Sequence, residues 1–294
     1  MKETFLEHRL AYLFILPTLL FLVLILWIPF FRGVWMSLHE WPLNGEPTWI
    51  GLENYTYLFE WDVFYTSLKA TFLFAFTTLI QLVIALAAAI AIKNIGHLKD
   101  IMSSIFLIPY TMPPVVTGTV WLYLLQPQQG PVWQYLVGWG ILDSPIYWSV
   151  SGDTAMAAIV GVTAWTFWPF MFLIIFASIE NIPDELYESA RVYGAGRIQT
   201  FLKVTLPNLK SAILVAVSIR MIWNLAKISQ PLQMTSGGPG YETSILAVLL
   251  YRFAYDRNQM GIAFAVGIVL LLVVIAFILV FLREFERDSG GASA

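Results

Sequence analysis

The chain has 294 residues, of which 59% are hydrophobic and only 12% are charged. Soluble globular proteins average roughly 45–50% and 25%, so the composition excludes an ordinary soluble domain and indicates a protein that lies in lipid. A formal net charge of −3 gives no electrostatic basis for binding nucleic acid. The chain contains no cysteine, which excludes disulfides, thiolate metal sites and thiol catalysis.

Six apolar stretches are long enough to cross a membrane as helices. A spanning helix needs about 20 mainly apolar residues, because its backbone groups must be satisfied internally across roughly 30 Å of hydrocarbon. Five stretches contain no charged residue, and the sixth contains Arg220 and Lys227. The expected spans are 10–31, 70–92, 101–125, 154–179, 211–231 and 260–282. They predict an all-α membrane protein that forms one transmembrane domain over residues 1–294.

Basic residues indicate the side on which each connection lies. Six crossings place both ends of the chain on one side, and ten Lys and Arg residues lie on that side against four on the other. Because cytoplasmic segments carry the excess of Lys and Arg, both termini are expected in the cytoplasm. The outer loop at 126–152 has no Lys or Arg. Its four large aromatic residues suit a membrane interface: Trp133, Trp139, Tyr147 and Trp148.

The longest inner connection, at 180–208, is expected to form two short helices. The first covers 181–194, and the second covers 197–204 and ends at Leu206-Pro207. Inner connections of membrane proteins are usually shorter than this, so the loop is expected to have a specific role.

The first of these helices is predicted to be amphipathic. Leu186, Ala190 and Tyr193 follow one another at helical spacing and form an apolar stripe, whereas Glu185 and Glu188 lie off it. Such a helix suits insertion into a groove on another protein. Packing of the same stripe onto the chain's own helix bundle fits the pattern equally well.

The spacing of residues in this loop resembles the signature loop of permease subunits of ATP-binding-cassette (ABC) importers. The matching residues are Glu188, Ser189 and Ala190, then Gly194, Val204 and Leu206-Pro207. Ser189 stands where the family usually has Ala, and Val204 where it usually has Ile. In that family the loop is a coupling helix that sits in a cleft of the cytoplasmic ATPase. The resemblance therefore implies an ATPase-coupling role for Glu185, Glu188, Ser189, Ala190, Gly194 and Pro207.

Four separate segments also resemble the sugar-type, maltose/trehalose-like subgroup of these permeases. They are 50–55 with 58–59, 109–121, 182–188 and 235–239, in the order of the family. This resemblance implies the type I ABC importer permease fold and import of a mono- or oligosaccharide across the cytoplasmic membrane of a prokaryote by alternating access. It also implies several partners: a second, homologous permease expected to be a different chain, two ATPase subunits and an extracytoplasmic solute-binding protein.

The chain itself is not expected to hydrolyse ATP. None of its 19 glycines is followed by lysine, so it has no G-x-x-x-x-G-K-[S/T] phosphate loop. No hydrophilic stretch is long enough to form an ATPase domain. ATP and Mg²⁺ are therefore expected on a separate ATPase chain, and this chain is expected to bind no cofactor of its own.

Four residues of the predicted fifth span are candidates for contact with the substrate. Arg220, Trp223, Asn224 and Lys227 fall at i, i+3, i+4 and i+7 and share one helix face. A lipid-facing Arg or Lys costs about 2.5–3.5 kcal/mol on insertion scales, so this face is expected to line a cavity or a protein contact. Trp beside Asn suits a sugar, because the ring covers the C–H face and the amide binds hydroxyls.

Two other interpretations of this face remain open. Arg220 and Lys227 would pair with the second permease or extend to the membrane surface, or they would bind an anionic group such as a phosphate or carboxylate. The family's frequent Phe-Asp pair after this point is replaced by Ile228-Ser229, which leaves Lys227 without its nearest expected acidic partner.

The family resemblance extends the candidate site to the preceding helix. It places Trp223, Asn224 and Lys227, together with Thr166, Phe167 and Phe170, at positions that contact substrate. The aromatic residues of this second group fit helix packing equally well.

The sequence bears on three other functions. A permease of the same superfamily that carries a glycerol phosphate, an oligopeptide or an anion stays open because of the two cations. An ion-coupled carrier is disfavoured, because such proteins carry acids at the midplane and every Asp and Glu here lies outside the six spans. A membrane-embedded enzyme or metal site is disfavoured because no His, Cys, Asp or Glu occurs in any span.

Overall fold

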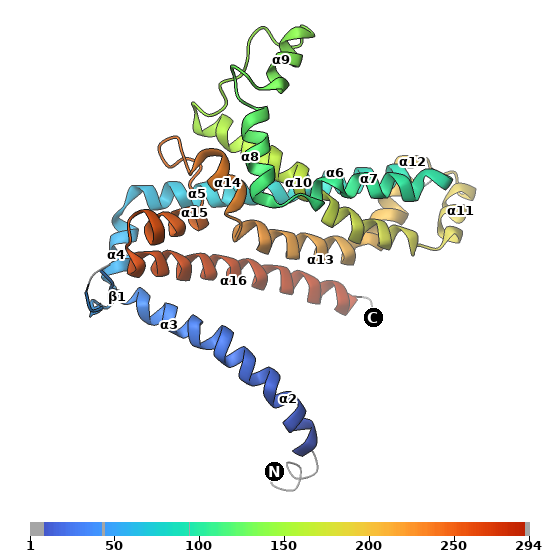
Figure 1. The fold of residues 1–294 in the computed structure, drawn as a ribbon. Coiled ribbons are helices and arrows are strands. Elements are labelled where there is room, and N and C mark those ends of the chain that lie inside the picture. The colour runs from blue at the N-terminus through green and yellow to red at the C-terminus, as the bar shows by residue number, and fades with distance from the viewer. Residues whose placement is uncertain (1–8, 43–44, 94, 292–294) are drawn as a thin grey trace. The chain divides into compact units, whose positions relative to one another are not determined.

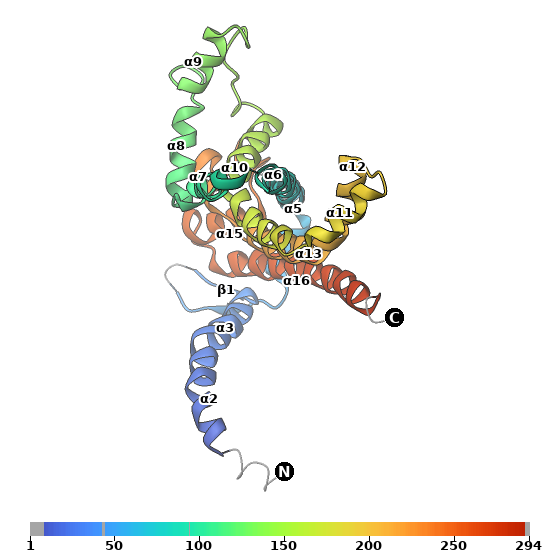
Figure 2. The ribbon, with the colours of Figure 1, turned by 90° about the vertical axis from the view of Figure 1, so that its right-hand side faces the viewer.

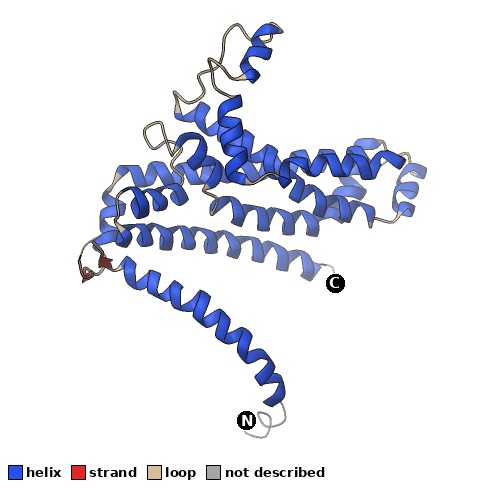
Figure 3. Ribbon diagram, in the orientation of Figure 1, coloured by secondary structure: helices blue, strands red, loops and turns tan. Residues whose placement is uncertain are grey.

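The computed structural model describes residues 9–42, 45–93 and 95–291, and nearly all of its regular structure is helical (Figures 1 and 3). Of the domain predicted over residues 1–294, residues 1–8, 43–44, 94 and 292–294 lie outside the described residues. Contacts between Cα atoms divide the chain into two units, Met1–Trp61 with Leu250–Val269 and Asp62–Leu249 with Leu270–Ala294. The prediction of an all-α membrane protein is confirmed.

Among the described residues, five helices are long and apolar enough to cross a membrane, and a bent pair of helices forms a sixth candidate. The five are Tyr12–Ser37, Asp62–Ile92, Gly152–Glu180, Arg197–Leu225 and Met260–Phe281. Several helices extend beyond the predicted spans. The apolar run marks the part that crosses lipid, whereas helical backbone geometry continues for as long as the flanking residues allow it.

The first unit contains the N-terminal helix and a short hairpin. Helix α2 (Arg9–Leu22), the π-helical turn η1 (Val23–Trp27) and α3 (Ile28–Ser37) form one continuous helix. Strand β1 (His39–Glu40) then pairs antiparallel with β2 (Thr48–Trp49), and α4 (Glu53–Glu60) follows. The apolar side chains along 12–31 are exposed within this chain, which suits contact with lipid or with another subunit.

Asn54 of α4 fixes the end of α3 and the hairpin. Its side-chain amide donates to the backbone carbonyls of Ser37 at 2.8 Å and His39 at 3.0 Å. The start of α16 (Met260–Gly291) packs here as well. At Gly261 an added Cβ would collide with the His39 carbonyl and the Asn54 amide, so a glycine is required for this close approach.

Helix α10 (Gly152–Glu180) is the centre of the second unit. It packs against α6 (Thr77–Ile92), which follows α5 (Asp62–Ala75), and against α13 (Leu206–Leu225). Figures 1 and 2 show α6, α10 and α13 side by side. Ala85, Ala89 and Ala216 are fully buried in these contacts, and their small side chains let the helices approach closely.

The third predicted span, 101–125, is not a single straight helix. It consists of α7 (Lys99–Thr111) and α8 (Pro114–Leu124), bent by 89°. Met112 between them is extended, with ψ at 132°, as expected for a residue that precedes proline. Pro113 has no N–H to continue the first helix, and Pro114 starts the second at its first turn. Figure 1 shows α8 standing across the direction of α10 and α13.

The four aromatic residues of the 126–152 loop differ in their exposure. Trp133 lies in α9 (Pro131–Gly138) and is buried. Trp148, which follows α9 in the chain, is buried as well. Both indole N–H groups donate to the Leu125 carbonyl at 2.7 Å, which closes the loop onto the end of α8. Trp139 and Tyr147 are exposed.

The second helix of the inner loop does not end at Pro207. Helix α12 (Arg197–Thr200) continues through the π-helical turn η3 (Phe201–Thr205) into α13, as one helix. In η3 the Leu206 N–H bonds to the Phe201 carbonyl, five residues back, and this wider turn accommodates Pro207 in the next turn.

The fifth span also ends earlier than expected. Helix α13 stops at Leu225, and α14 (Ser229–Thr235) begins after a break. Pro231 therefore lies in α14 and not in the spanning helix. Lys227 lies in the break between the two helices.

Candidate functional site

Arg220 and Asn224 form the centre of a buried polar network inside the second unit. Arg220 is 1% exposed, and its Nη2 donates to Asn224 Oδ1 at 2.8 Å. Its Nε donates to Gln81 Oε1 of α6 at 3.0 Å. Asn224 Nδ2 donates to Thr78 Oγ1 at 2.9 Å and to Gln81 Oε1 at 3.3 Å. A buried cation is costly unless it is hydrogen-bonded, and this network supplies the bonds.

The partners of Arg220 and Asn224 in this structure all lie within the second unit. Asn224 is fully buried, and both ends of its amide are bonded to protein groups, so the amide is not open to a sugar hydroxyl in this structure. Arg220 is bonded inside its own helix bundle and does not extend to the membrane surface. Both residues act as internal supports of α13 against α6.

Gln81 and Thr78 belong to the network and are not among the residues predicted from the sequence. Gln81 receives bonds from both Arg220 and Asn224, and its Nε2 donates to the Thr163 carbonyl of α10 at 3.1 Å. It thus connects three spanning helices. A signal was present, because Gln81 is the only amide in the apolar stretch 70–92, and a strongly polar side chain at membrane depth requires a polar partner.

An aromatic cluster lies beside this network. Phe167 of α10 is buried beneath the Arg220 guanidinium, whose Cζ is 4.4 Å from the ring centroid. Phe170 and Trp223 have ring centroids 4.7 Å apart, and Tyr110 of α7 lies 6.4 Å from Phe170. Trp223 is 45% exposed, so one part of its ring is open to a ligand or to another subunit.

Lys227 lies in the break between α13 and α14, and its side chain extends to the same aromatic cluster. Its Nζ is 3.6 Å from the centroid of Phe167, in the geometry of a cation–π contact. Within the described residues no ion pair of Lys227 occurs, which agrees with the absence of any Asp or Glu from the apolar spans. The cluster formed by Phe167, Phe170, Trp223 and Lys227 is called the aromatic–cation cluster below.

The remaining candidate on α10, Thr166, is turned into the protein. It is fully buried, and its hydroxyl donates to the Val162 carbonyl of its own helix at 2.7 Å. The structure therefore brings Phe167, Phe170, Trp223 and Lys227 together, with Arg220 and Asn224 behind them, and leaves Thr166 outside the cluster.

The first helix of the inner loop, α11 (Asp184–Val192), lies at one end of the bundle made by α6, α10 and α13 (Figure 1). Its apolar stripe is not packed onto that bundle, since Leu186 is 42% exposed and Tyr193 88% exposed. Most of the residues given a coupling role by the resemblance are exposed as well: Glu185, Glu188, Ser189, Gly194 and Pro207, with Ala190 half-buried. The alternative in which the stripe packs onto its own bundle does not hold in this structure.

Tyr187 and Gly194 hold α11 in place. The Tyr187 ring packs against the bundle with Lys93 Nζ 3.5 Å from its centroid, and its hydroxyl lies 3.3 Å from Thr205 Oγ1. At the end of the helix Gly194 has φ of +74°, and its N–H bonds to the Arg191 carbonyl at 3.0 Å. A left-handed residue at this place is the common way to end a helix, and glycine adopts it without steric cost.

An ion pair joins the ends of two spanning helices near α11. Lys99 at the start of α7 pairs with Glu180 at the end of α10. Both residues lie on the side of the membrane that the distribution of basic residues predicts to be the inner one. The pair holds α7 against α10 where the inner loop begins.

These features define a multi-pass membrane protein with a polar and aromatic cluster in its spanning helices and an exposed amphipathic helix at one end. The family of binding-protein-dependent transport system inner membrane components matches residues 81–288. The chain belongs to this family, and the predicted resemblance to permease subunits of ABC importers is confirmed.

Full-length relatives agree with this assignment. The probable ABC transporter permease protein YurN of Bacillus subtilis is 32% identical over 279 residues, covering 94% of this chain and 95% of that protein. The trehalose/maltose transport system permease protein MalF of Thermococcus litoralis is 30% identical over 294 residues, covering 98% of each.

The fold also matches a solved structure. A chain in the crystal structure of a bacterial alginate ABC transporter, in complex with an alginate pentasaccharide-bound periplasmic protein, superimposes with a TM-score of 0.82 at 23% identity. The match covers 98% of this chain and 97% of that chain. The chain therefore has the ABC importer permease fold.

Proposed function

We propose that this chain is a permease subunit of an ATP-driven importer that moves a sugar across the cytoplasmic membrane of a prokaryote by alternating access. The half-exposed Trp223, whose ring is tilted against that of Phe170 in the aromatic–cation cluster, carries the proposal, because an open aromatic face in a spanning bundle is the group a sugar ring binds. The trehalose/maltose relative supports a sugar as the substrate.

Four further chains would complete the importer. A second, different permease would face the open side of the aromatic–cation cluster, and two ATPase subunits would bind and hydrolyse ATP with Mg²⁺. An external solute-binding protein would deliver the sugar, which the dependence of the family on binding proteins supports. This chain contributes the path and the coupling loop.

The exposed helix α11 is proposed as the contact with the ATPase. Leu186, Val192 and Tyr193 leave apolar surface uncovered on the side expected to face the cytoplasm. Covering that surface with a groove of the ATPase would recover hydrophobic free energy. Movement of the ATPase would then move α11 and the helices joined to it.

A sugar that carries an acidic group is a second candidate substrate. Arg220 and Lys227 place two cations at the aromatic–cation cluster, and within the described residues no carboxylate pairs with either of them. A carboxylate or sulfonate on the sugar would compensate Lys227, which is the more accessible of the two.

The test is sugar-stimulated ATP hydrolysis by the reconstituted importer with maltose, trehalose and an alginate oligosaccharide as probes. Trp223→Ala is expected to lower the response to sugar, and Glu188→Ala to separate hydrolysis from transport. The matched control is Trp139→Ala, because it removes an exposed indole that does not belong to the aromatic–cation cluster. Equal sugar responses of the Trp223 and Trp139 variants would show that the cluster does not bind the substrate.

A further inference from the structure

A pocket of about 700 Å³ opens beside α11, within the second unit. Its walls come from the ends of α6 and α10, from α11, and from the helix that begins at Arg197. Helices α11 and α12 lie side by side there (Figures 1 and 2). Pockets that bind ligands range from about 300 to 1,000 Å³, so the volume suits a small molecule or the headgroup of a lipid.

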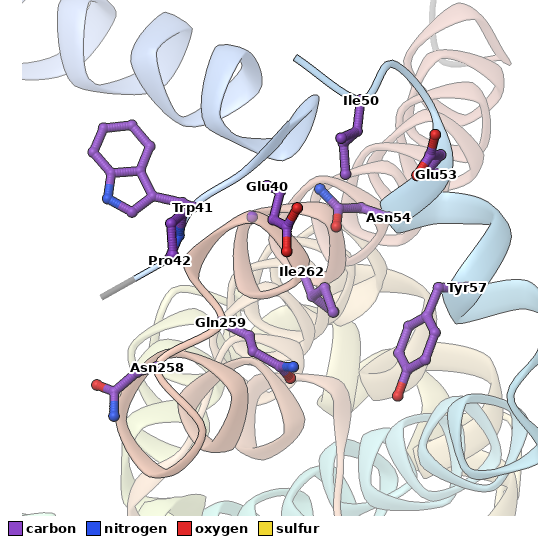
Figure 4. A pocket seen from close by; sticks show the side chains of 11 residues that line it. Glu40, Trp41, Pro42, Ile50, Glu53, Asn54, Tyr57, Asn258, Gln259 and Ile262 are labelled. Carbon is purple, nitrogen blue, oxygen red and sulfur yellow. The ribbon is translucent and has the colours of Figure 1, made fainter. Parts of the chain in front are cut away.

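The walls of this pocket are basic. Its three cationic side chains are Lys93, Arg191 and Arg197. Asp184 also lines the pocket, and within the described residues no ion pair joins it to any of these cations. The walls therefore carry two more positive than negative charges. The pocket of the first unit shown in Figure 4 has the opposite character, since Glu40 and Glu53 line it and none of its described lining residues is Lys or Arg.

The ammonium group of Lys93 has no acceptor of its own. Its Nζ is buried and has no hydrogen-bond partner among the described residues. The ring centroid of Tyr187 lies 3.5 Å away and covers one side of the ammonium by a cation–π contact, but the ring supplies no acceptor oxygen for the three N–H donors. Buried polar groups usually have a partner and are costly without one. An acceptor from outside this chain is therefore expected in the pocket.

Further donors lie in the same walls. Tyr187 Oη and Thr205 Oγ1 are 3.3 Å apart and share one hydrogen bond, so the hydrogen of the accepting hydroxyl stays available to a ligand. Arg191 donates from Nε to the Tyr187 carbonyl at 3.4 Å, and the described residues accept no bond from its Nη groups. Arg197 is exposed and forms no ion pair within the part of the chain described.

A phosphate group matches this set of donors. Its oxygens accept hydrogen bonds, and its negative charge compensates the excess of cations. Phosphate also presents three acceptor oxygens, so it can bond at once to groups on α6, on α11 and on the helix that begins at Arg197. Arginine is well suited to this contact, because its planar fork of N–H groups fits phosphate oxygens.

The position of the pocket gives two sources for such a phosphate. It lies at the ends of the spanning helices, on the side that the distribution of basic residues predicts to be cytoplasmic. Ile90 lines it and is 41% exposed on α6, so an apolar helix surface adjoins the basic walls. Basic pockets between membrane helices on this side bind the headgroups of anionic lipids. A soluble phosphate compound reaches the same side from the cytoplasm.

Helix α11 presents this pocket and its apolar stripe on different faces. Asp184, Tyr187 and Arg191 fall at i, i+3 and i+7 and line the pocket together. The apolar stripe lies roughly a third of a turn away around the helix. A partner that covers the stripe therefore does not occupy the face that lines the pocket.

We propose that this pocket binds the phosphate group of an anionic molecule, with Lys93, Arg191 and Arg197 as its ligands. A bound phosphate joins the end of α6, α11 and the helix that begins at Arg197, and so fixes α11 to two spanning helices. The proposal does not depend on which solute the chain transports.

The experiment uses the complete importer in lipid nanodiscs, with a non-hydrolysable ATP analogue present throughout to occupy the nucleotide sites of the ATPase subunits. In nanodiscs of phosphatidylcholine, isothermal titration calorimetry at constant ionic strength measures the binding of inorganic phosphate. In nanodiscs that also contain phosphatidylglycerol, native mass spectrometry measures how much phosphatidylglycerol stays bound to the protein.

Two variants test the pocket, and a third is the control. Lys93→Met removes the buried charge and keeps most of the length of the side chain. Arg197→Gln removes the charge of an exposed residue, so it leaves the packing intact and decides the matter if the Lys93 variant does not fold. The control is Lys203→Gln, since Lys203 is an exposed cation of η3 that does not line the pocket. The thermal unfolding temperature without phosphate shows whether each variant is folded.

Each test variant is expected to raise the Kd for inorganic phosphate, or to lower the retained phosphatidylglycerol, about tenfold. The control is expected to stay within about twofold of the native protein. Binding of inorganic phosphate that the test variants weaken supports a soluble ligand, and retention of phosphatidylglycerol alone that they weaken supports a lipid. The proposal is overturned if the native importer binds neither probe, or if the test variants and the control bind equally well.

Discussion

Replacing Gln81 with leucine tests whether the buried network holds the spanning helices together. Leucine fills a similar volume but removes three side-chain hydrogen bonds: those accepted from Arg220 and Asn224 and the one donated to the Thr163 carbonyl. The Arg220 guanidinium would keep its bond to Asn224 and lose the one from Nε. The variant therefore removes the hydrogen-bond acceptor of a buried cation while keeping the packing nearly constant.

The size of the effect follows from these bonds. Hydrogen bonds between membrane helices are worth about 0.6 kcal/mol on average, so three of them give about 2 kcal/mol. The bond from a charged donor is worth more, about 1.5–3 kcal/mol. We expect Gln81→Leu to lower the free energy of unfolding by about 3 kcal/mol.

The assay is denaturant unfolding of the purified membrane complex, with Gln134→Leu as the control because Gln134 is exposed on α9. Arg220→Met should lower the free energy of unfolding less in the Gln81→Leu background than in the native protein. In that background it removes a buried cation that has already lost the hydrogen bond from its Nε. A coupling above about 1 kcal/mol is expected for residues in one network. Additive losses, or a Gln81 variant as stable as the Gln134 variant, would contradict the network.

Two glycines give further predictions, each with a matched control. Gly194→Ala places a side chain at φ of +74° and should destabilise the end of α11 by about 1–2 kcal/mol. It should also weaken the coupling of ATP hydrolysis to transport. Gly196→Ala is its control, because Gly196 has φ of −72°, and it should leave the coupling unchanged. Gly118→Ala would bring a Cβ to 2.9 Å from Gln233 Cβ and should lower the thermal unfolding temperature, whereas Gly161→Ala meets no atom within 4 Å and should not. Equal behaviour of either pair would refute the steric reasoning.

The spanning helices were predictable because lipid imposes a strong requirement on composition. Each apolar run had to satisfy its own backbone, so the existence and order of the spans followed from hydropathy. The ends of the helices could not be predicted from hydropathy, since a run of apolar residues shows which part of a helix lies in lipid and not where the helix begins or ends. Thus the helix that contains residues 70–92 begins at Asp62, and the one that contains 211–225 begins at Arg197.

Prolines have different effects in two of the predicted helices. Pro113 and Pro114 break the third predicted span into two helices. Pro207 was expected to end a helix, but the helix continues through it. The π-helical turn before Pro207 shifts the hydrogen-bond pattern, so that the helix tolerates the backbone N–H that proline lacks. The difference depends on the hydrogen-bond pattern of the preceding turn, which the residue types in η3 do not reveal.

The site was only partly predictable, because its contacts join distant parts of the chain. The spacing of Arg220 and Asn224 predicted a shared face, and the structure joins them by a hydrogen bond. Their partner Gln81 lies 139 residues earlier than Arg220. An isolated amide in an apolar run indicates that a partner exists, but one sequence does not identify which helix supplies it.

The continuity of the helix Arg197–Leu225 has a mechanical consequence. At about 1.5 Å per residue, its 29 residues form a rod roughly 43 Å long. One end of this rod adjoins α11, and the other end carries Arg220, Trp223 and Asn224. A tilt imposed at the inner end therefore displaces the residues at the far end directly, with no flexible connection between them. The π-helical turn at Phe201–Thr205 is the place where such a rod would bend, so its stiffness sets how much of the displacement is transmitted.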